Sequence, residues 1–290
     1  MVDNKSYTYV LEHDTGFAPN PFFGYLTLAA CKPLLKGENG IRKDVTEESL
    51  KEPVWIFANG GRRLYLEDYE FQNNKLVKLK LNWNSYHRLV YAFRVDKILT
   101  FENYYNDPLF SKKKRINSSS QIETFGDNNL HCPKKDQEKL IMQYTEDPII
   151  KITGSNKVVE ELPKIDIKVN KVLISAKGQF YYFGCFAPNI LEEFEKHFLK
   201  GSPNHKLIKD EKERDKIIEK IEEICPKPGI YGFPSFNNKK EFREYATNKD
   251  YLKEIYHKCF DKNTQNIIRD WISQMQTNGG FKNSTIKDII

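Results

Sequence analysis

A proline-stiffened loop between two strand-like runs constrains the fold of this chain more than any other feature. The runs Tyr7–Leu11 and Phe22–Leu28 are rich in the aromatic and β-branched residues that favour strands. Between them, Gly16 permits a positive φ, while Pro19 and Pro21 fix φ and remove two backbone donors. Such a loop holds close to one conformation. Because flanking strands would hold its polar groups within reach of solvent, we expect a functional site here.

Alternation of side chains predicts further short strands in the first two thirds of the chain. Residues 87–98 (HRLVYAFRVDKI) are apolar on both faces of the alternation, which predicts an interior strand. Val54–Ala58 predicts another strand, and residues 171–184 predict a hairpin with its turn at Gly178. Shorter strands are predicted at residues 62–66 and 75–81. Strands at such close spacing indicate a small closed or nearly closed barrel, or a mixed sheet.

Helical periodicity replaces strand alternation in the last third of the chain. Apolar residues recur at helical spacing in residues 206–226, and further helices are predicted at 239–246, 248–260 and 263–276. Within residues 100–110 of the first part, a short helix is predicted with Thr100 as its cap and its end before Asp107-Pro108. We therefore predict a single compact α+β unit over residues 1–290. Its β-rich core would span about 7–188, and its helical C-terminal part about 189–290.

Composition and charge exclude several classes of protein. Hydrophobic residues make up 39% of the chain, mean hydropathy is −0.66, and no apolar run approaches the roughly 20 residues that cross a bilayer. The N-terminus lacks a basic start followed by an apolar segment, so we expect a cytoplasmic protein. Five scattered cysteines without zinc spacing argue against a disulfide framework or a structural metal. The net charge of +6 is compatible with a phosphate-bearing partner.

Common enzyme motifs are missing from the sequence. The chain contains no GxxxxGKS or GxxxxGKT, no GxGxxG, no HExxH and no GxSxG. This argues against the commonest nucleoside-triphosphate-binding, dinucleotide-binding, metalloprotease and α/β-hydrolase classes.

The sharpest enzymatic hypothesis makes Cys31 a nucleophile and His13 its base. Either Asp14 or Asp127 would then be the orienting acid. Lys32, next to Cys31, would lower the pKa of the thiol. The competing interpretation, which we favour, is that Cys31 is a small core residue at the end of an apolar strand. His13 and Asp14 are adjacent at a strand end and point to opposite sides, so they would not form a dyad with each other.

Two further polar segments carry candidate binding residues. In residues 125–133 (FGDNNLHCP), Asp127 and Asn128 could hold a substrate or a water, or could close a turn on their own backbone. Residues 111–120 (SKKKRINSSS) contain four consecutive cations, which are Lys112, Lys113, Lys114 and Arg115. The common outcome for such a run is a solvated surface segment, and the functional alternative is an arm that contacts phosphate.

Four stretches together resemble the nucleotide modification associated domain family, second type. They are residues 13–33 (HDTGFAPNPFFGYLTLAACKP), 89–110 (LVYAFRVDKILTFENYYNDPLF), 126–129 (GDNN) and 173–184 (LISAKGQFYYFG). The matching blocks span about residues 7–190, and GIYGFP at 229–234 extends them. Where the family pattern leads us to expect a Gly-Asp-Trp turn, this chain has Glu52-Pro53-Val54-Trp55 and lacks the turn carboxylate. The strand pattern is also similar, at fold level, to the PUA-like and EVE-like barrels of modified-base readers.

The resemblance implies a role in nucleotide-modification or phage-defence systems, without a settled reaction. Our leading hypothesis is that the chain binds a modified nucleotide or modified DNA. The residues expected to hydrogen-bond the edge of the base are His13, Asp14, Asn20 and Asp127, and Lys32 and Asn128 are also expected to bind the ligand. The residues expected to stack on a base are Phe17, Trp55 and Tyr105, and those expected to contact phosphate are Lys112 to Arg115.

Two other readings stay open at this point. The chain could be an enzyme that acts on a nucleotide or on a base modification, through Cys31 or through His13 and Asp14. It could also be a scaffold subunit whose aromatic clusters form the core and whose basic loop binds nothing. The sequence leaves the cofactor, the protein partners and the metal requirement unknown, and it contains no residue set that we assign to a metal. It does not select the base, the modification, DNA over a free nucleotide, or an oligomeric state.

Overall fold

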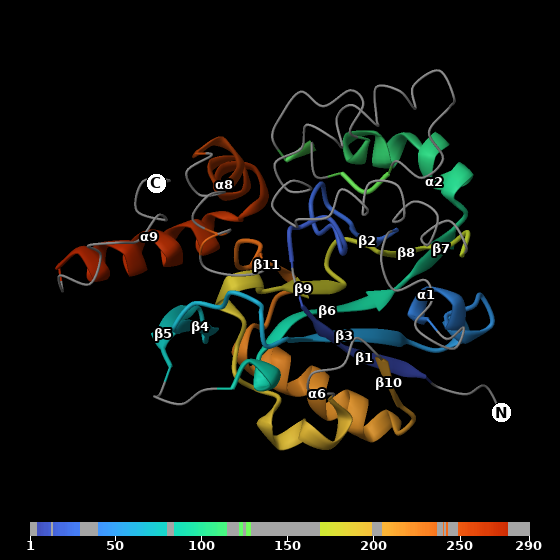
Figure 1. The fold of residues 1–290 in the computed structure, drawn as a ribbon, viewed down its shortest axis with the longest axis horizontal. Coiled ribbons are helices and arrows are strands. Elements are labelled where there is room, and N and C mark those ends of the chain that lie inside the picture. The colour runs from blue at the N-terminus through green and yellow to red at the C-terminus, as the bar shows by residue number, and fades with distance from the viewer. Residues whose placement is uncertain are drawn as a thin grey trace.

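A mixed sheet of six strands crosses the middle of the molecule (Figure 1). The computed structural model describes residues 5–12, 14–29, 40–79, 84–114, 122–123, 126–128, 169–198, 205–236, 240, 242 and 249–277. The strands, in their order across the sheet, are β10 (His205–Ile208), β1 (Ser6–Leu11), β3 (Val54–Gly60), β6 (Leu89–Val95), β9 (Phe180–Tyr182) and β11 (Gly229–Ile230). β1 pairs parallel to β3, and β6 pairs antiparallel to both β3 and β9.

The central strands are those that alternation predicted. Every residue of β1 and β3 is buried, and in β6 only Arg94 is partly exposed, as expected for strands covered on both faces. The predictions of strands at Tyr7–Leu11, at Val54–Ala58 and within residues 87–98 are therefore confirmed. The prediction of an α+β fold with its helices mostly in the C-terminal part is also confirmed.

The sheet is open, so the expectation of a barrel is wrong and its alternative, a mixed sheet, is confirmed. A barrel requires its first and last strands to pair. In the described part of the chain, β10 and β11 are the two edges of the sheet and do not pair with each other. Both edge strands come from beyond residue 189, in the part predicted to be helical. Short extended segments there complete the sheet, and four-residue and two-residue strands carry too little alternation to be recognised.

Two smaller sheets flank the main one. One contains β2 (Leu26–Leu28), β8 (Val172–Ser175) and β7 (Lys97–Leu99), and the other is the hairpin of β4 (Tyr69–Gln72) and β5 (Lys75–Lys78). Gly178 lies in the predicted turn with φ +83°, but β8 and β9 enter different sheets, so residues 171–184 do not form the predicted hairpin. The expected strand at 62–66 is not formed. The strand predicted within 75–81 is formed as β5, but its partner β4 was missed, because the turn between them uses Asn73 and Asn74, both at positive φ, in place of glycine.

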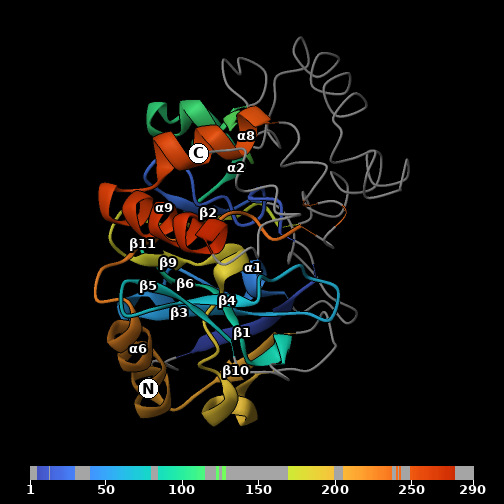
Figure 2. The same cartoon turned by 90° about the vertical axis from the view of Figure 1, so that its left-hand side faces the viewer.

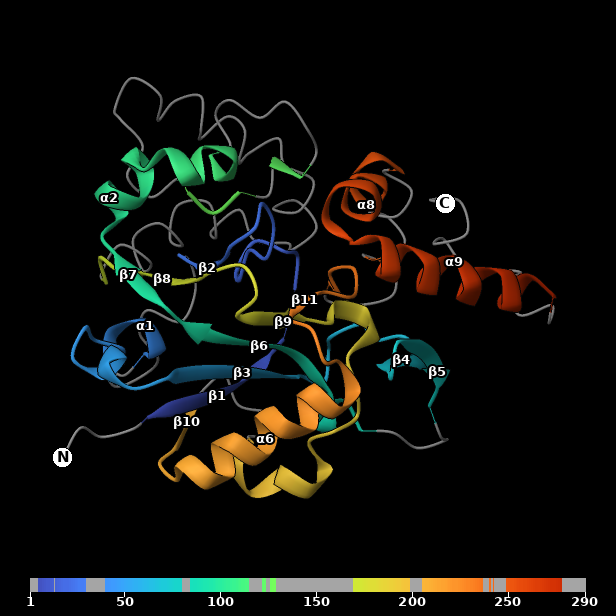
Figure 3. The same cartoon turned by 180° about the vertical axis from the view of Figure 1, so that it is seen from behind.

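Helices cover both faces of the main sheet (Figures 1 and 2). Below it lie α6 (Glu211–Ile224), which buries Ile217, Ile221 and Ile224, and the short helix η7 (Glu192–His197). Above it lie the β2-β8-β7 sheet, α2 (Phe101–Asn106), α8 (Lys249–Glu254) and α9 (Lys262–Thr277), an arrangement also seen from behind (Figure 3). The remaining short helices are α1 (Ile41–Asp44), η1 (Ser49–Lys51), η2 (Ser85–His87), η3 (Pro108–Lys113), η6 (Gly184–Phe186) and η8 (Ile255–Cys259).

The N-terminal cap of α2 is the one that the sequence predicted. The Thr100 side chain accepts a hydrogen bond from the backbone N–H of Asn103 at 3.2 Å. The helix ends at Asp107, which in turn caps η3 by accepting from the backbone N–H of Leu109 at 3.0 Å. α2 and η3 thus meet at a fixed corner. None of the helices in the described ranges is long and apolar enough to cross a membrane.

Candidate functional site

The loop of residues 14–29 folds back on itself above the main sheet. The backbones of Asn20 and Thr27 exchange two hydrogen bonds, at 2.8 and 2.9 Å. Phe23 and Gly24 form the tip of this closed loop, both at positive φ. At the base of the loop, the carbonyl of Asp14 accepts from the N–H of Phe236 at 2.6 Å. The segment that the sequence singled out is therefore a compact structure with its polar groups directed inward.

Lys113 anchors this loop from the end of η3. Its Nζ donates to Oδ1 of Asn20 at 2.7 Å and to the carbonyl oxygen of Asn20 at 2.9 Å. It also contacts the carbonyl oxygen of Tyr25 at 2.9 Å and Oγ1 of Thr27 at 3.0 Å. The side chain is only 1% exposed. An ammonium group is thus buried among oxygens that belong to a loop 86 to 93 residues earlier in the chain.

Asp127 balances the buried charge. Its carboxylate accepts from Oγ1 of Thr27 at 2.8 Å and from the hydroxyl of Tyr104 at 2.6 Å. Burial raises the pKa of Asp127, while the nearby Lys113 charge and both hydrogen bonds oppose that rise. Burial likewise lowers the pKa of Lys113 to about 7, and the Asp127 carboxylate opposes that fall. We call Asn20, Thr27, Tyr104, Lys113 and Asp127 the lysine cluster.

The turn of residues 126–128 packs against η3 through Gly126 and Asn128. A Cβ on Gly126 would lie 2.0 Å from the Lys113 carbonyl oxygen, so the position admits only glycine. The N–H of Asn128 donates to that same oxygen at 3.0 Å, and its Nδ2 donates to the carbonyl of Tyr104 at 2.9 Å. The Gly-Asp-Asn sequence therefore joins the turn to the loop and to α2.

Asp14 lies in a second buried cluster, on the main sheet. Its carboxylate accepts from the Tyr182 hydroxyl at 2.6 Å and from the N–H groups of Gly16 at 3.0 Å and Ser235 at 3.4 Å. Burial raises the pKa of Asp14 to about 6, although all three hydrogen bonds lower it. A carboxyl group that titrates near neutrality is typical of functional sites and also of buried structural pairs.

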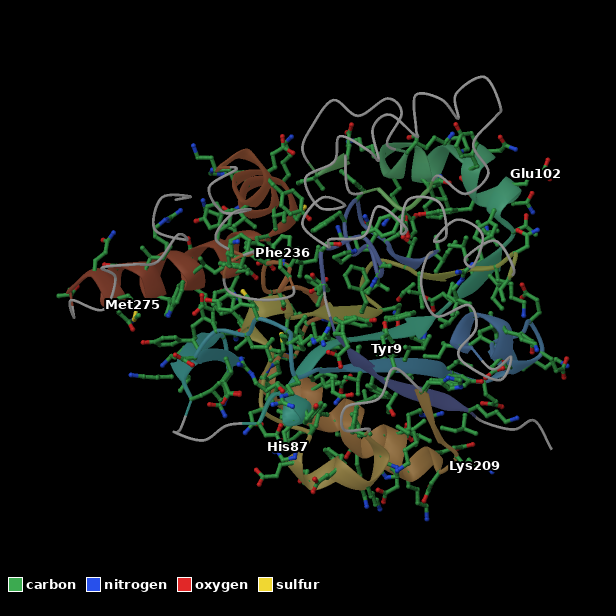
Figure 4. All side chains as sticks on the ribbon, in the orientation of Figure 1. Tyr9, His87, Glu102, Lys209, Phe236 and Met275 are labelled. Carbon is green, nitrogen blue, oxygen red and sulfur yellow. The ribbon has the colours of Figure 1, made fainter. Side chains whose placement is uncertain are left out.

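Tyr182, the partner of Asp14, belongs to a row of tyrosines on the main sheet. Tyr9, Tyr91 and Tyr182 lie in one row across the sheet, with Ala58 between the first two. Tyr9 is labelled at the centre of the molecule in Figure 4. The buried hydroxyls of Tyr91 and Ser235 have no hydrogen-bond partner among the residues that the structure describes.

The outer surface of α2 and η3 presents an aromatic ring and two lysines. Nζ of Lys114 lies 4.2 Å from the ring centre of Tyr105, in a cation–π contact. Lys112 is exposed, and Leu109 next to it is 60% exposed. Tyr104 and Lys113 are buried at the same corner, whereas their sequence neighbours Tyr105 and Lys112 lie on its outer side.

The predicted site residues do not form one group. Asn20, Asp127 and Asn128 meet around Lys113, whereas Asp14 lies in the separate cluster with Tyr182. Lys113, which we grouped with the exposed cations, is buried. η3 is kinked at Phe110, and Lys113, after the kink, is held inside by its hydrogen bonds to oxygens of Asn20, Tyr25 and Thr27.

Trp55 and Phe17 stand apart from these clusters. Trp55 is 9% exposed and stacks on Phe57 at 6.0 Å. It alternates with Ile56 and Ala58, so it points to the α6 face of the sheet, away from the loop. Phe17 is partly exposed on the loop. His13, Cys31, Lys32 and Arg115 lie outside the described residues, and their proposed roles stay predictions.

Sequence reasoning missed Thr27, Tyr104, Tyr182 and Ser235. Thr27 and Tyr182 sit in apolar runs that read simply as strands, and nothing local marks their hydroxyls as partners of a carboxylate. Tyr104 had a usable signal, because Phe101 and Tyr104 are spaced for one buried helix face. Among the described residues, no three His, Cys, Asp or Glu side chains are grouped closely enough to hold a metal ion.

The described cysteines are poorly suited to nucleophilic chemistry. Burial raises the pKa of Cys185, that of Cys225 to about 11 and that of Cys259 to about 12. A thiolate nucleophile, if this protein uses one, would therefore be Cys31 or Cys132, both outside the described residues.

We expect iodoacetamide to label Cys185, Cys225 and Cys259 more than about tenfold slower than a free cysteine, whose pKa is about 8.5. Peptide mass spectrometry over a time course measures the five rates separately. The nucleophile hypothesis requires Cys31 to react faster than the other four cysteines. Equal or slower labelling of Cys31 rejects it.

The raised pKa of Asp14 predicts how stability depends on pH. The native state keeps a proton that the unfolded chain loses at about pH 4, so this stabilisation is complete below pH 4 and is lost as pH rises through about 6. Relative to Asp14→Asn, the wild type should lose about 3 kcal/mol of unfolding free energy by pH 7.5. Urea unfolding followed by circular dichroism measures this difference.

The exposed Glu102, labelled at the periphery in Figure 4, provides the control for that experiment. Glu102→Gln should leave the pH profile of the wild type unchanged. Parallel profiles for the wild type and Asp14→Asn would show that Asp14 does not titrate in this range.

Comparison with known proteins gives one family. No curated protein and no solved structure matches the chain. A family model described as nucleotide modification associated domain 2 matches residues 3–242. The match includes the six strands of the main sheet, the lysine cluster and Asp14, and it ends before α8 and α9. This protein therefore belongs to the nucleotide modification associated domain 2 family.

Proposed function

We propose that this protein binds a modified nucleotide, or a nucleic acid that carries one, on the surface formed by α2, η3 and the loop of residues 14–29. The family is associated with nucleotide modification. DNA modification or defence against phage is the setting that we propose for this binding. The contact between Tyr105 and Lys114 is the observation that carries the proposal.

A base can replace Lys114 on the ring of Tyr105. An exposed cation–π contact contributes about 0.5–1 kcal/mol, whereas a base stacked on an aromatic side chain contributes about 1–3 kcal/mol. Stacking of a base can therefore offset the loss of the contact between Lys114 and Tyr105. We expect the displaced Lys114 ammonium to contact a phosphate of the bound nucleotide. Lys112, exposed on η3, adds a second phosphate contact.

The lysine cluster supports this surface from below. Asn128 holds the carbonyls of Tyr104 and Phe110, and Lys113 is fixed between the two surface lysines. Because the backbone of the corner is already ordered, ligand binding does not have to order it. Asp14, Asn20 and Asp127 are at most 1% exposed, so we assign them to the support of the loop and not to direct contact with the base.

We expect Tyr105→Ala to weaken binding of single-stranded DNA about 5- to 150-fold, which corresponds to the loss of one stacked base. Tyr105→Phe keeps the ring and should stay within about twofold of the wild type. Fluorescence anisotropy with a labelled strand of about 12 nucleotides measures both. Strands with cytosine or with 5-hydroxymethylcytosine test whether the modification matters. Wild-type affinity in Tyr105→Ala would remove the stacking role.

The lysine contacts predict a change in salt dependence. Each phosphate contact to a single strand contributes about −0.7 to the slope of log K against log salt concentration. Lys112→Ala should reduce the slope by about this amount. Lys209→Ala is the matched control, because Lys209 is exposed at the opposite end of the molecule (Figure 4). Equal slopes for the wild type and Lys112→Ala would show that Lys112 contacts no phosphate.

A further inference from the structure

The tip of the loop of residues 14–29 holds a bulky aromatic residue in an unfavourable backbone conformation. Phe23 has φ +64° and Gly24 has φ +83°. Turns with two central residues at positive φ favour Asn-Gly, because a large side chain crowds the backbone in this region. The β4–β5 turn of the same chain fills its positive-φ positions with Asn73 and Asn74. Phenylalanine at position 23 therefore carries backbone strain that asparagine would not.

The packing of the loop does not require the ring of Phe23. The preceding Phe22 is fully buried and meets the ring of Tyr251 in a T-shaped contact at 6.4 Å, so Phe22 anchors the loop to α8. Phe23 packs at the margin of the same aromatic cluster and is itself partly exposed. A Cβ on the exposed Gly24 would meet nothing within 4 Å, so the tip borders open space. A strained residue at such a place is typical of a functional site.

The tip of the loop adjoins the proposed binding surface. Tyr25, two residues after Phe23, packs its ring on Phe110 of η3 with the ring centres 5.2 Å apart. Lys113, at the end of η3, donates from Nζ to the carbonyl oxygen of Tyr25 at 2.9 Å. The partly exposed Tyr105 lies on α2, which meets η3 at the corner. Partly exposed aromatic rings and lysines on adjoining segments are the combination that binds single-stranded nucleic acid.

We propose that Phe23 stacks on a second base, and that the ligand is therefore a single strand and not a free nucleotide. This inference rests on the proposed function, in which Tyr105 stacks on one base and the lysines beside it contact phosphate. A free nucleotide has a single base and can occupy only one of the two rings. A strand can place successive bases on both rings while its backbone follows the lysines.

Removal of the ring in the full chain tests the stacking role. Phe23→Asn suits the positive φ and should weaken binding of a labelled single strand of about 12 nucleotides about 5- to 150-fold, the loss of one stacked base. Phe23→Tyr keeps an aromatic ring and should stay within about twofold of the wild type. Asn74→Gly changes an exposed positive-φ residue of the β4–β5 turn and should leave the affinity unchanged. Wild-type affinity in Phe23→Asn overturns the proposal.

A second variant separates stacking from packing. Phe23→Leu keeps apolar bulk against the aromatic cluster but has no aromatic face, so its affinity for the strand should fall as that of Phe23→Asn does. Urea unfolding establishes that each variant is folded under the binding conditions. Lower stability with unchanged affinity is the result that a packing role predicts, and it overturns the proposal. If Phe23→Asn does not fold, Phe23→Leu decides alone.

Two further measurements test whether the ligand spans both rings. If Phe23 and Tyr105 stack on different bases, the losses of affinity in Phe23→Asn and Tyr105→Ala should multiply in the double variant. A double variant that binds no more weakly than either single variant overturns the proposal. Unlabelled dCMP should displace the labelled strand only at a concentration more than about fivefold above that of the unlabelled strand. Equal displacement by dCMP also overturns it.

The pattern of losses separates this inference from the proposed function. Loss of affinity in Tyr105→Ala with full affinity in Phe23→Asn supports the proposed function and contradicts the inference. Loss of affinity in Phe23→Asn with full affinity in Tyr105→Ala supports stacking at Phe23 and removes the role of Tyr105. A wild-type protein that does not bind the strand contradicts both.

Discussion

The hydrogen bonds of the buried Lys113 ammonium are the interactions on which the position of the loop of residues 14–29 depends. Placing a charge in the interior is costly unless hydrogen bonds and a counter-charge replace the lost water. Here the loop supplies four oxygens and the turn supplies the Asp127 carboxylate, linked to the loop through Thr27. η3, the loop of residues 14–29 and the turn of residues 126–128 are thereby held at one point. Removing one of the partners of Lys113 would leave its buried charge without full compensation for the lost water.

Two buried arginines also bind backbone carbonyl oxygens elsewhere in the molecule. Arg88, fully buried, donates to the carbonyls of Ala187, Glu67 and Tyr69. Arg42, also fully buried, donates to those of Lys171 and Val169. Apart from Tyr69, at the start of β4, these carbonyls belong to irregular backbone, and the arginines supply donors to acceptors that would otherwise be buried without them. Buried cations thus connect segments of the chain that strand pairing does not join.

The position of Lys113 links the interior to the proposed binding surface. Its neighbour Lys112 is exposed, and its other neighbour, the half-buried Lys114, covers the ring of Tyr105. A ligand bound to that surface by Lys112 or Lys114 would contact a sequence neighbour of the buried Lys113. The basic run that the sequence suggested as a phosphate-contacting arm thus contains two kinds of lysine. The buried Lys113 supports the proposed binding surface, whereas Lys112 and Lys114 form part of it.

Local patterns determined much of this protein. Alternation located β1, β3 and β6, the cap at Thr100 located α2, and the polar, proline-stiffened loop and the Gly-Asp-Asn turn marked the segments that meet at the lysine cluster. These features depend on neighbouring residues, so a sequence shows them. Tertiary structure decided the open sheet, the face to which Trp55 points, the separation of Asp14 from Asp127 and the inward direction of Lys113. Each depends on partners dozens to hundreds of residues away, and a lysine can be buried only where such partners supply the oxygens that its charge requires.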